Sequence, residues 1–167
     1  MIHKHIPGVK VKAKFSDCKK FRYQLTIENI TKTKGDSLCV IMQNPSIANT
    51  EIADKSVQFL EKLIFEKEVE LFKNVKTIII VNQFARIQTK YFKGKVEDIG
   101  TDNDIHIRNA MDSSNTILIA WGKTNPFLKR QQDILRIISS FKDKKVLMAK
   151  KHPSRGTYQK FLVPFSN

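Results

Sequence analysis

Cysteine, glycine, proline and long hydrophobic runs are all scarce in this chain. Its 167 residues include 2 cysteines, 6 glycines and 5 prolines. Cys18 and Cys39 form no C-x-x-C pair, so neither a disulfide framework nor a cysteine-rich metal site is indicated. No apolar run approaches the roughly 20 residues that span a bilayer, and the N-terminal segment lacks the apolar stretch of a signal peptide. We therefore expect a cytoplasmic protein.

Acidic side chains are also scarce. The chain has 16 Asp and Glu against 30 Lys and Arg, which leaves a formal net charge of +14 at pH 7. Such an excess indicates the partners that a protein attracts and says little about its fold. It favours DNA or RNA, with an anionic membrane surface as the weaker alternative. We expect a nucleic-acid partner and no membrane.

The remaining composition is that of an ordinary folded domain. Apolar residues make up 41% of the chain, which is enough to form a core. The length lies within the range of roughly 100–200 residues that is usual for one domain. Because no repeat or linker interrupts the chain, residues 1–167 are predicted to form a single domain and a monomer. Residues 1–20 are basic and are expected to form an N-terminal arm or an edge strand.

Short apolar runs predict the strands of a buried sheet. Residues 21–28 alternate between apolar and polar side chains, which is typical of an early strand. Four stronger candidates are nearly continuous apolar runs, the pattern of parallel strands buried on both faces. They are residues 38–42, 77–81, 116–120 and 145–149.

Helical patterns separate these strands. Residues 54–72 carry Val57, Leu60, Leu63 and Ile64 on one stripe. Residues 101–113 and 126–141 are the other two candidates. For the first of these, Thr101 or Asp102 is the expected cap and Asp104 lies in the first turn, and for the second the expected cap is Thr124 or Asn125. Alternating strands and helices predict right-handed βαβ units and an α/β fold, a three-layer α/β/α sandwich around a mainly parallel four-stranded sheet.

Polar side chains follow each of the four apolar runs. They are Gln43, Asn44 and Ser46 after the first, Asn82 and Gln83 after the second, Trp121 and Lys123 after the third, and Lys150, Lys151, His152 and Ser154 after the fourth. In an open parallel sheet, ligands bind beyond the carboxyl ends of the strands. The sequence therefore predicts a binding or catalytic site at this edge.

Each of these residues also has a structural explanation. Asn44 before Pro45 is typical of a turn, and Asn82 can cap backbone groups at a strand end. His152 can be a surface histidine before a proline, and Trp121 can belong to the core. Four such residues at four successive strand ends favour a site over four separate explanations.

Metal and nucleotide-triphosphate motifs are absent. His3 and His5 lack partners for a metal site, and no cluster of His, Asp and Glu at metal-ligand spacing occurs elsewhere. Gly122-Lys123-Thr124 resembles the end of a P-loop, but Ile117 stands where the first glycine is required. We expect no metal and no other cofactor.

The four segments resemble, in order and spacing, those of the uracil-DNA glycosylase superfamily. Residues 43–46 are similar to that family's water-handling loop, which carries Asn-Pro in its mismatch-specific branch. Asn82 resembles the asparagine that reads the base. Residues 116–122 are similar to a strand ending in Trp-Gly, and residues 152–154 match a His-Pro-Ser motif.

More closely, the chain resembles the domain-of-unknown-function family 1643, an uncharacterised bacterial and phage group. This resemblance covers most of residues 21–156. The matching residues are Asn44-Pro45-Ser46, Ala48, Asp54, Ser56, Asn82, Phe84-Ala85, Ile99-Gly100, Asn103-Asp104 and Trp121-Gly122. The group has no agreed activity, so this second resemblance implies no function.

The glycosylase resemblance implies roles for the site residues. His152 would donate a hydrogen bond to the negative charge on the departing base, and Asn44 would orient the attacking water. The base would be contacted by Gln43, Ser46, Asn82, Phe84 and Phe59. The nucleic-acid backbone would be held by Lys123, Lys150, Lys151, Ser154 and Arg155.

Three departures from that family refine the expectation. Asn44 has no charge, which predicts slow turnover or a good leaving group. Ser46 replaces a bulky tyrosine and would admit a C5 substituent on the pyrimidine. Arg155-Gly156 replaces an intercalating hydrophobic residue, which favours single-stranded over double-stranded DNA.

Three functions follow as hypotheses. The first is a DNA glycosylase-like hydrolase for an unusual or modified pyrimidine, as in base excision and DNA repair. The second is a catalytically silent DNA- or RNA-binding protein that uses the same pocket and basic groove. The third is an enzyme that processes nucleosides or nucleotides. Steep weakening of binding with salt would favour the first two over the third.

Overall fold

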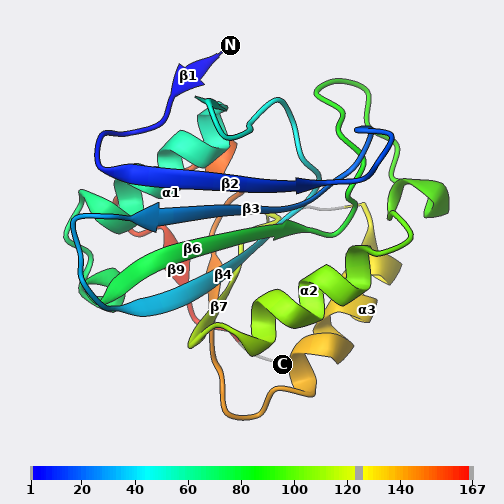
Figure 1. Cartoon of the computed structure of the whole chain (residues 1–167). Coiled ribbons are helices and arrows are strands. Elements are labelled where there is room, and N and C mark those ends of the chain that lie inside the picture. The colour runs from blue at the N-terminus through cyan, green and yellow to red at the C-terminus, as the bar shows by residue number, and fades with distance from the viewer. Residues whose placement is uncertain (1, 123–125, 166–167) are drawn as a thin grey trace.

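The protein is an α/β domain built on one large mixed sheet. Figure 1 shows the computed structural model, which describes residues 2–122 and 126–165. In the described residues the strands are β1 (His3–Lys4), β2 (Val9–Phe15), β3 (Arg22–Asn29), β4 (Asp36–Met42), β5 (Ile52–Ala53), β6 (Val75–Asn82), β7 (Thr116–Ile119), β8 (Lys145–Ala149) and β9 (Leu162–Val163). The helices are α1 (Lys55–Phe65), α2 (Asn103–Asp112) and α3 (Leu128–Ser139), with short 3-10 turns η1 (Glu70–Phe72), η2 (Val96–Asp98) and η3 (Pro153–Arg155).

The main sheet has seven strands in the order β2-β3-β6-β4-β7-β8-β9. Its centre, β6-β4-β7-β8, is parallel, as the four apolar runs predict. The prediction of a four-stranded sheet is wrong, because β2, β3 and β9 add to it in antiparallel pairing. The physical reason lies in β6, whose outer edge carries backbone groups that the alternating strand β3 pairs with. Strand β2 then forms one edge of the sheet.

The central strands are apolar along their whole length because helices cover both faces of the sheet. In β4, Leu38, Val40 and Met42 belong to the core cluster under α1, whereas Cys39 and Ile41 belong to the cluster under α2 and α3. Successive strand residues point to opposite faces, so a strand covered on both sides shows no polar alternation. Figure 1 shows α2 and α3 together on the face opposite α1.

The first predicted helix is divided. The continuous helix α1 ends at Phe65, and the last part of the predicted range 54–72 forms η1. Asp54 is the N-cap of α1, and its carboxylate accepts a hydrogen bond from the Val57 N–H at 2.9 Å. The stripe of Val57, Leu60, Leu63 and Ile64 is buried, as predicted.

The other two helices start close to their predicted positions. Asp102 occupies the N-cap position of α2, although its side chain makes no capping hydrogen bond. Phe127 occupies that position in α3, and the predicted caps Thr124 and Asn125 lie outside the described residues. None of the helices in the described ranges is long and apolar enough to cross a membrane.

The strand order places a crevice beside β4. Along the chain the parallel strands run β4, β6, β7, β8, but β6 lies on one side of β4 and β7 on the other. The connections that leave the carboxyl ends of β4 and β7 therefore diverge, and open α/β sheets bind ligands at such a point.

Candidate functional site

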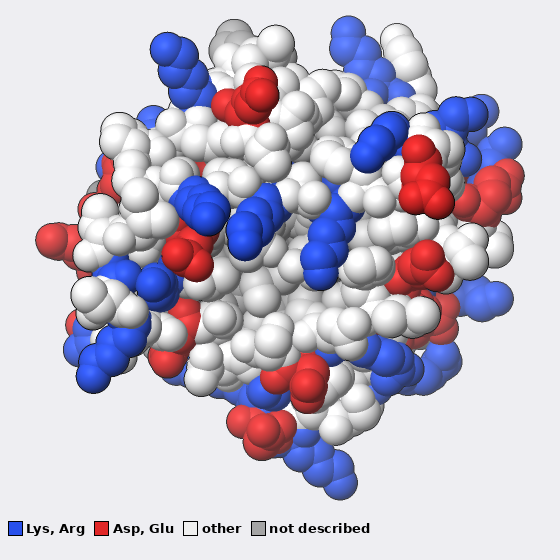
Figure 2. All heavy atoms as spheres, viewed as in Figure 1, with Lys and Arg blue, Asp and Glu red and all other residues white. Residues whose placement is uncertain are grey.

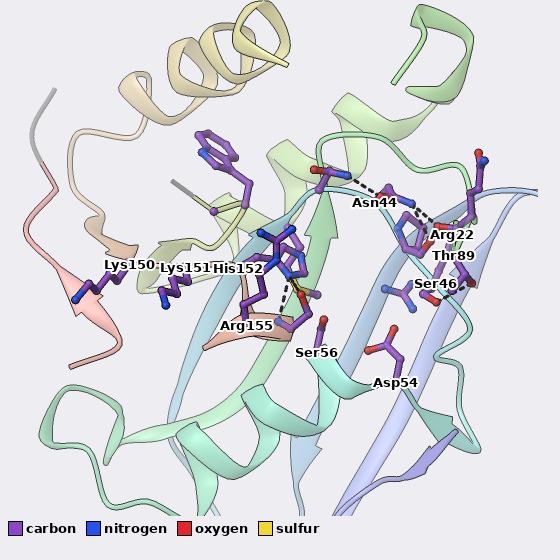
Figure 3. A pocket seen from close by; sticks show the side chains of 17 residues that line it. Arg22, Asn44, Ser46, Asp54, Ser56, Thr89, Lys150, Lys151, His152 and Arg155 are labelled. Carbon is purple, nitrogen blue, oxygen red and sulfur yellow. Dashed lines mark hydrogen bonds between the residues drawn. The ribbon is translucent and has the colours of Figure 1, made fainter. Parts of the chain in front are cut away.

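A cavity of about 700 Å³ opens at this point of the sheet. Its walls come from the segments after β4, β7 and β8, from the start of α1, from β3 and from the loop between β6 and α2 (Figure 3). The lining residues are Arg22, Met42, Gln43, Asn44, Pro45, Ser46, Asp54, Ser56, Gln88, Thr89, Trp121, Gly122, Lys150, Lys151, His152, Ser154 and Arg155. The cavity therefore collects the polar residues that follow three of the four parallel strands.

His152 is held as a neutral hydrogen-bond donor. Its Nδ1 accepts a hydrogen bond from the Ser154 N–H at 3.1 Å and lies 2.9 Å from the Ser154 hydroxyl. Because a backbone N–H can only donate, Nδ1 carries no proton and the ring proton is on Nε2. Burial lowers the pKa of His152 to about 4; the charge of Asp54 opposes this shift and that of Arg155 adds to it. At neutral pH the ring is uncharged and offers one N–H.

Asn44 links two loops of the site. Its Nδ2 donates to the backbone carbonyl of Gln88 at 2.8 Å and to that of Pro45 at 3.2 Å. Its Oδ1 accepts from Gln43 Nε2 at 3.2 Å. The amide nitrogen is therefore occupied, and Oδ1, with a second lone pair, is the atom of this side chain that can act on a ligand or water.

Two further hydrogen bonds join the same loops. The Gln88 N–H donates to the Pro45 carbonyl at 3.0 Å, and the hydroxyls of Ser46 and Thr89 lie 3.0 Å apart. One wall of the cavity is thus a pair of loops held together along residues 44–46 and 88–89. Figure 3 shows Ser46 and Thr89 on the side of the cavity opposite the lysines.

Asp54 is the acid that the sequence predictions of the site did not include. It is the one acidic residue among the described residues that line the cavity. Oδ1 caps α1 through the Val57 N–H, and in the described chain no hydrogen bond engages Oδ2. Two features of the sequence pointed to Asp54: its match to family 1643 and its place at the start of the predicted helix 54–72. The second feature is equally explained by a structural cap. The cavity therefore has a carboxylate although Asn44 has none.

Arg22 supplies a buried cation to the same wall. Its side chain is 1% exposed, and Nη1 donates to the Ala48 carbonyl at 2.8 Å. Burial lowers the pKa of Arg22 to about 10, against the opposing charge of Asp54. The guanidinium is therefore protonated at neutral pH, and its Nε has no hydrogen-bond partner among the described residues.

Exposed basic side chains form the rim. Lys150, Lys151 and Arg155 are exposed and lie together beside His152 (Figure 3). With Arg22 they give the described lining four cations against the single carboxylate of Asp54. The predicted Lys123 lies outside the described residues. This balance favours an anionic ligand.

The comparisons with known proteins agree with the family expected from the sequence. Residues 22–156 match a family described as a protein of unknown function (DUF1643). The chain belongs to DUF1643. The match runs from Arg22 to Gly156, so all the lining residues of the cavity fall inside the DUF1643 region. No curated protein and no solved structure matches the chain.

Three predicted base contacts of this DUF1643 protein do not reach the cavity. Asn82 is fully buried, because β6 still pairs with β4 at Met42 and the pairing continues from Phe84 N–H to the Gln43 carbonyl. Both polar atoms of the Asn82 amide lack partners in the described chain. Asn82 is therefore not among the described residues that line the cavity.

The two predicted aromatic contacts are also packed elsewhere. Phe84 is 2% exposed and meets the rings of Phe92 and Phe127 edge to face. Phe59 stacks on Tyr158 with the ring centroids 4.7 Å apart. Phe59 and Phe84 therefore support the walls and do not line the cavity. No cluster of His, Cys, Asp or Glu in residues 2–122 and 126–165 is arranged to hold a metal ion.

Proposed function

We propose that this DUF1643 protein is a nucleic-acid base-handling enzyme, a DNA glycosylase-like hydrolase that cleaves the N-glycosidic bond of an unusual or modified pyrimidine. The observation that carries the proposal is the neutral, Nε2-protonated His152 in a cavity with a basic rim. The order of the Asn-Pro, Trp-Gly and His-Pro-Ser segments, which resembles that of uracil-DNA glycosylases, supports it.

His152 acts on the departing base in this proposal. As the bond between C1′ and the base nitrogen breaks, its electron pair leaves with the base and negative charge builds on a ring oxygen. The Nε2–H of His152 donates a hydrogen bond to that oxygen. Its low pKa suits this task, because a fixed neutral donor is available at all pH values well above about 4.

Asp54 and Asn44 act on the sugar side. A positive charge develops at C1′, and a water adds there to complete the hydrolysis. The Asp54 carboxylate stabilises the positive charge and accepts the water proton, while Asn44 Oδ1 accepts a hydrogen bond from the same water. Asp54 thereby supplies the charge that Asn44 lacks.

The rim binds the backbone of the strand that carries the base. Lys150, Lys151 and Arg155 contact phosphates, which positions the strand without reading its sequence. A base enters a cavity of this kind only after it leaves the stack, which costs a few kcal/mol and least in a single strand.

A second function is favoured by the state of Asn44. Its amide nitrogen is committed to the Gln88 carbonyl, so the side chain has a structural duty that needs no reaction. A protein that binds a flipped base without cleaving it would keep the cavity, the rim and this loop link. We retain this catalytically silent nucleic-acid-binding protein as the alternative.

Base release distinguishes the two. Labelled oligonucleotides carrying uracil, mismatched thymine or C5-modified pyrimidines, single- and double-stranded, are incubated with the protein, and free nucleosides are tested in parallel. We expect release that falls about 10²–10³-fold in His152→Ala, because one donor to the developing anion is lost. His106→Ala is the matched control, since His106 stacks on Tyr23 and does not line the cavity.

Two results would contradict the hydrolase. Salt-sensitive binding of oligonucleotides without any base release would leave the silent binding protein. Cleavage of free nucleosides in preference to oligonucleotides would indicate a nucleoside-processing enzyme instead.

A further inference from the structure

The loop that follows the cavity wall presents an exposed aromatic ring. Tyr91 comes two residues after the lining residue Thr89, and it is 87% exposed. Lys90, Lys93 and Lys95 flank it and are also exposed. A single exposed ring is ordinary on a protein surface. Tyr91 is distinguished by its place among three exposed lysines directly beyond the cavity wall.

The base of this loop is firmly packed. Phe92, the next residue, meets Phe84 edge to face at a centroid distance of 5.2 Å and Phe127 at 5.8 Å. Gly94 has a φ of +67°, and a Cβ there would lie 2.2 Å from a ring carbon of Phe127. The loop therefore has a defined shape below its exposed tip.

The tip itself is strained. Tyr91 has a φ of +57°, in the left-handed region that residues with bulky side chains rarely adopt. Its neighbour Lys90 is held by a hydrogen bond from Gln88 Nε2 to the Lys90 carbonyl at 2.8 Å. The neighbouring anchors hold the backbone where Tyr91 projects, and strain of this kind is concentrated at functional positions.

The same loop is fixed to the cavity. Its residues 88–89 are joined to residues 44–46 by the hydrogen bonds described above, so Tyr91 stands just beyond the wall. Figure 1 shows the segment between β6 and α2 projecting beyond the sheet. In Figure 2, basic and acidic side chains stand out from the upper right of this face, where Figure 1 places that segment beside the turn between β2 and β3.

We propose that residues 90–95 form a binding element for single-stranded nucleic acid, in which Tyr91 stacks on the base next to the nucleotide in the cavity and the flanking lysines bind phosphates. Aromatic rings with lysines along a backbone track are the general means of binding single strands. In a duplex both faces of each base are already stacked, so an exposed ring gains a partner only where bases are unpaired. The inference rests on the nucleic-acid partner of the proposed function and is independent of base release.

Binding of an ordinary oligonucleotide tests the inference without any chemistry. The probe is a fluorescein-labelled 20-mer of unmodified bases, single-stranded or as a duplex, and the readout is fluorescence anisotropy. We expect Tyr91→Ala to weaken binding of the single strand about 5- to 150-fold, which corresponds to the loss of one base–aromatic stack. Tyr91→Trp should keep the affinity within about twofold because it preserves the stack.

A neighbouring exposed residue provides the matched control. Val96 is 82% exposed and lies in the same connection, so Val96→Ala should leave binding unchanged. Duplex binding should be equal in Tyr91→Ala and the wild type. Because Tyr91 is exposed, Tyr91→Ala and Tyr91→Trp should both fold, which circular dichroism and thermal melting verify.

The inference is overturned if Tyr91→Ala binds the single strand as the wild type does, or loses single-strand and duplex affinity equally. A wild-type protein that binds no oligonucleotide overturns it too. Its failure is distinct from that of the proposed function. Base release with no effect of Tyr91 defeats only the inference, whereas Tyr91-dependent binding without base release defeats only the hydrolase.

Discussion

Asp54 both caps a helix and lines the candidate cavity. Oδ1 accepts from the Val57 N–H and caps α1, and Asp54 also lines the cavity that holds His152. Burial lowers the pKa of His152, and the negative charge of Asp54 partly offsets that effect, so the two side chains interact electrostatically. The two tasks can be separated, since asparagine caps a helix about as well as aspartate but has no charge.

Asp54→Asn should therefore lower activity without unfolding the protein. Both Asp54→Asn and Asp54→Ala remove the charge that faces the buried Arg22, so we expect each to lower the free energy of unfolding. Asp54→Asn keeps the cap and should be more stable than Asp54→Ala by about 1 kcal/mol. Base release should fall in both, and the pKa of His152, followed by NMR, should fall further below its already lowered value. Wild-type release by Asp54→Asn would show that another group acts on the water.

At the scale of elements, His5 connects the N-terminal segment to α1 and to the segment between β4 and β5. His5 Nδ1 lies 2.5 Å from Oε1 of Glu61 on α1, and Nε2 donates to the Asn49 carbonyl at 2.8 Å. Glu61 Oε2 also accepts from the Ile6 N–H at 3.1 Å. Because both ring nitrogens face acceptors, the cluster favours the doubly protonated, charged ring.

The stabilisation by His5 should depend on pH. Burial lowers its pKa, but the hydrogen bonds to Glu61 and Asn49 outweigh this effect and raise the pKa above 6.5. A group with a raised folded pKa stabilises fully below the unfolded value, and that stabilisation is lost as pH rises through the folded value. His5→Ala should thus cost roughly 3 kcal/mol at pH 6, measured by urea unfolding, and less at pH 9.

His3→Ala, in the same terminal segment, serves as the control. We expect the difference in unfolding free energy between His3→Ala and the wild type to be small and equal at the two pH values. A loss in His5→Ala that is the same at pH 6 and pH 9 would mean that the ring acts by packing alone.

At the scale of the whole molecule, part of the net charge of +14 is gathered at the cavity rim. Lys150 and Lys151 follow the carboxyl end of β8, whereas Lys142 and Lys145 lie at its other end. All four are exposed, so the two pairs differ in position and not in charge or accessibility.

Salt dependence shows whether position matters. Replacing Lys150 and Lys151 by alanine should reduce the slope of log affinity against log salt for a single strand by about 1.4, since each phosphate contact contributes about 0.7. Replacing Lys142 and Lys145 should leave the slope unchanged. Equal reductions in both variants would mean that the overall charge, and no particular groove, attracts the nucleic acid.

The central fold was predictable because burial on both faces makes a strand continuously apolar. That pattern identified β4, β6, β7 and β8, and β8 lies at the predicted residues 145–149. For residues 1–20 the sequence allowed either an arm or an edge strand, because lysines occupy the exposed positions of what is strand β2. Strand β9 has two residues, too few for any periodicity.

Only those residues of the candidate site that directly follow a parallel strand could be predicted from the sequence. Asn44 and His152 meet in one cavity because parallel strands bring their carboxyl ends together. Arg22 and Asp54 were missed as site residues, since their positions depend on the pairing of β3 with β6 and on how residues 43–53 fold back. Asn82 was placed at the edge, whereas pairing beyond β6 keeps it inside the sheet.

The two edges of the sheet limit how copies of this protein can associate. Strand β2 exposes Lys10, Lys12 and Lys14 at alternate positions, and β9, at the opposite edge, spans only two residues. A row of ammonium groups makes two such edges repel, and a two-residue edge offers almost no backbone for a neighbour to extend. Copies packed closely along one polyanion would therefore stay separate molecules, without a shared sheet from which a fibril could grow.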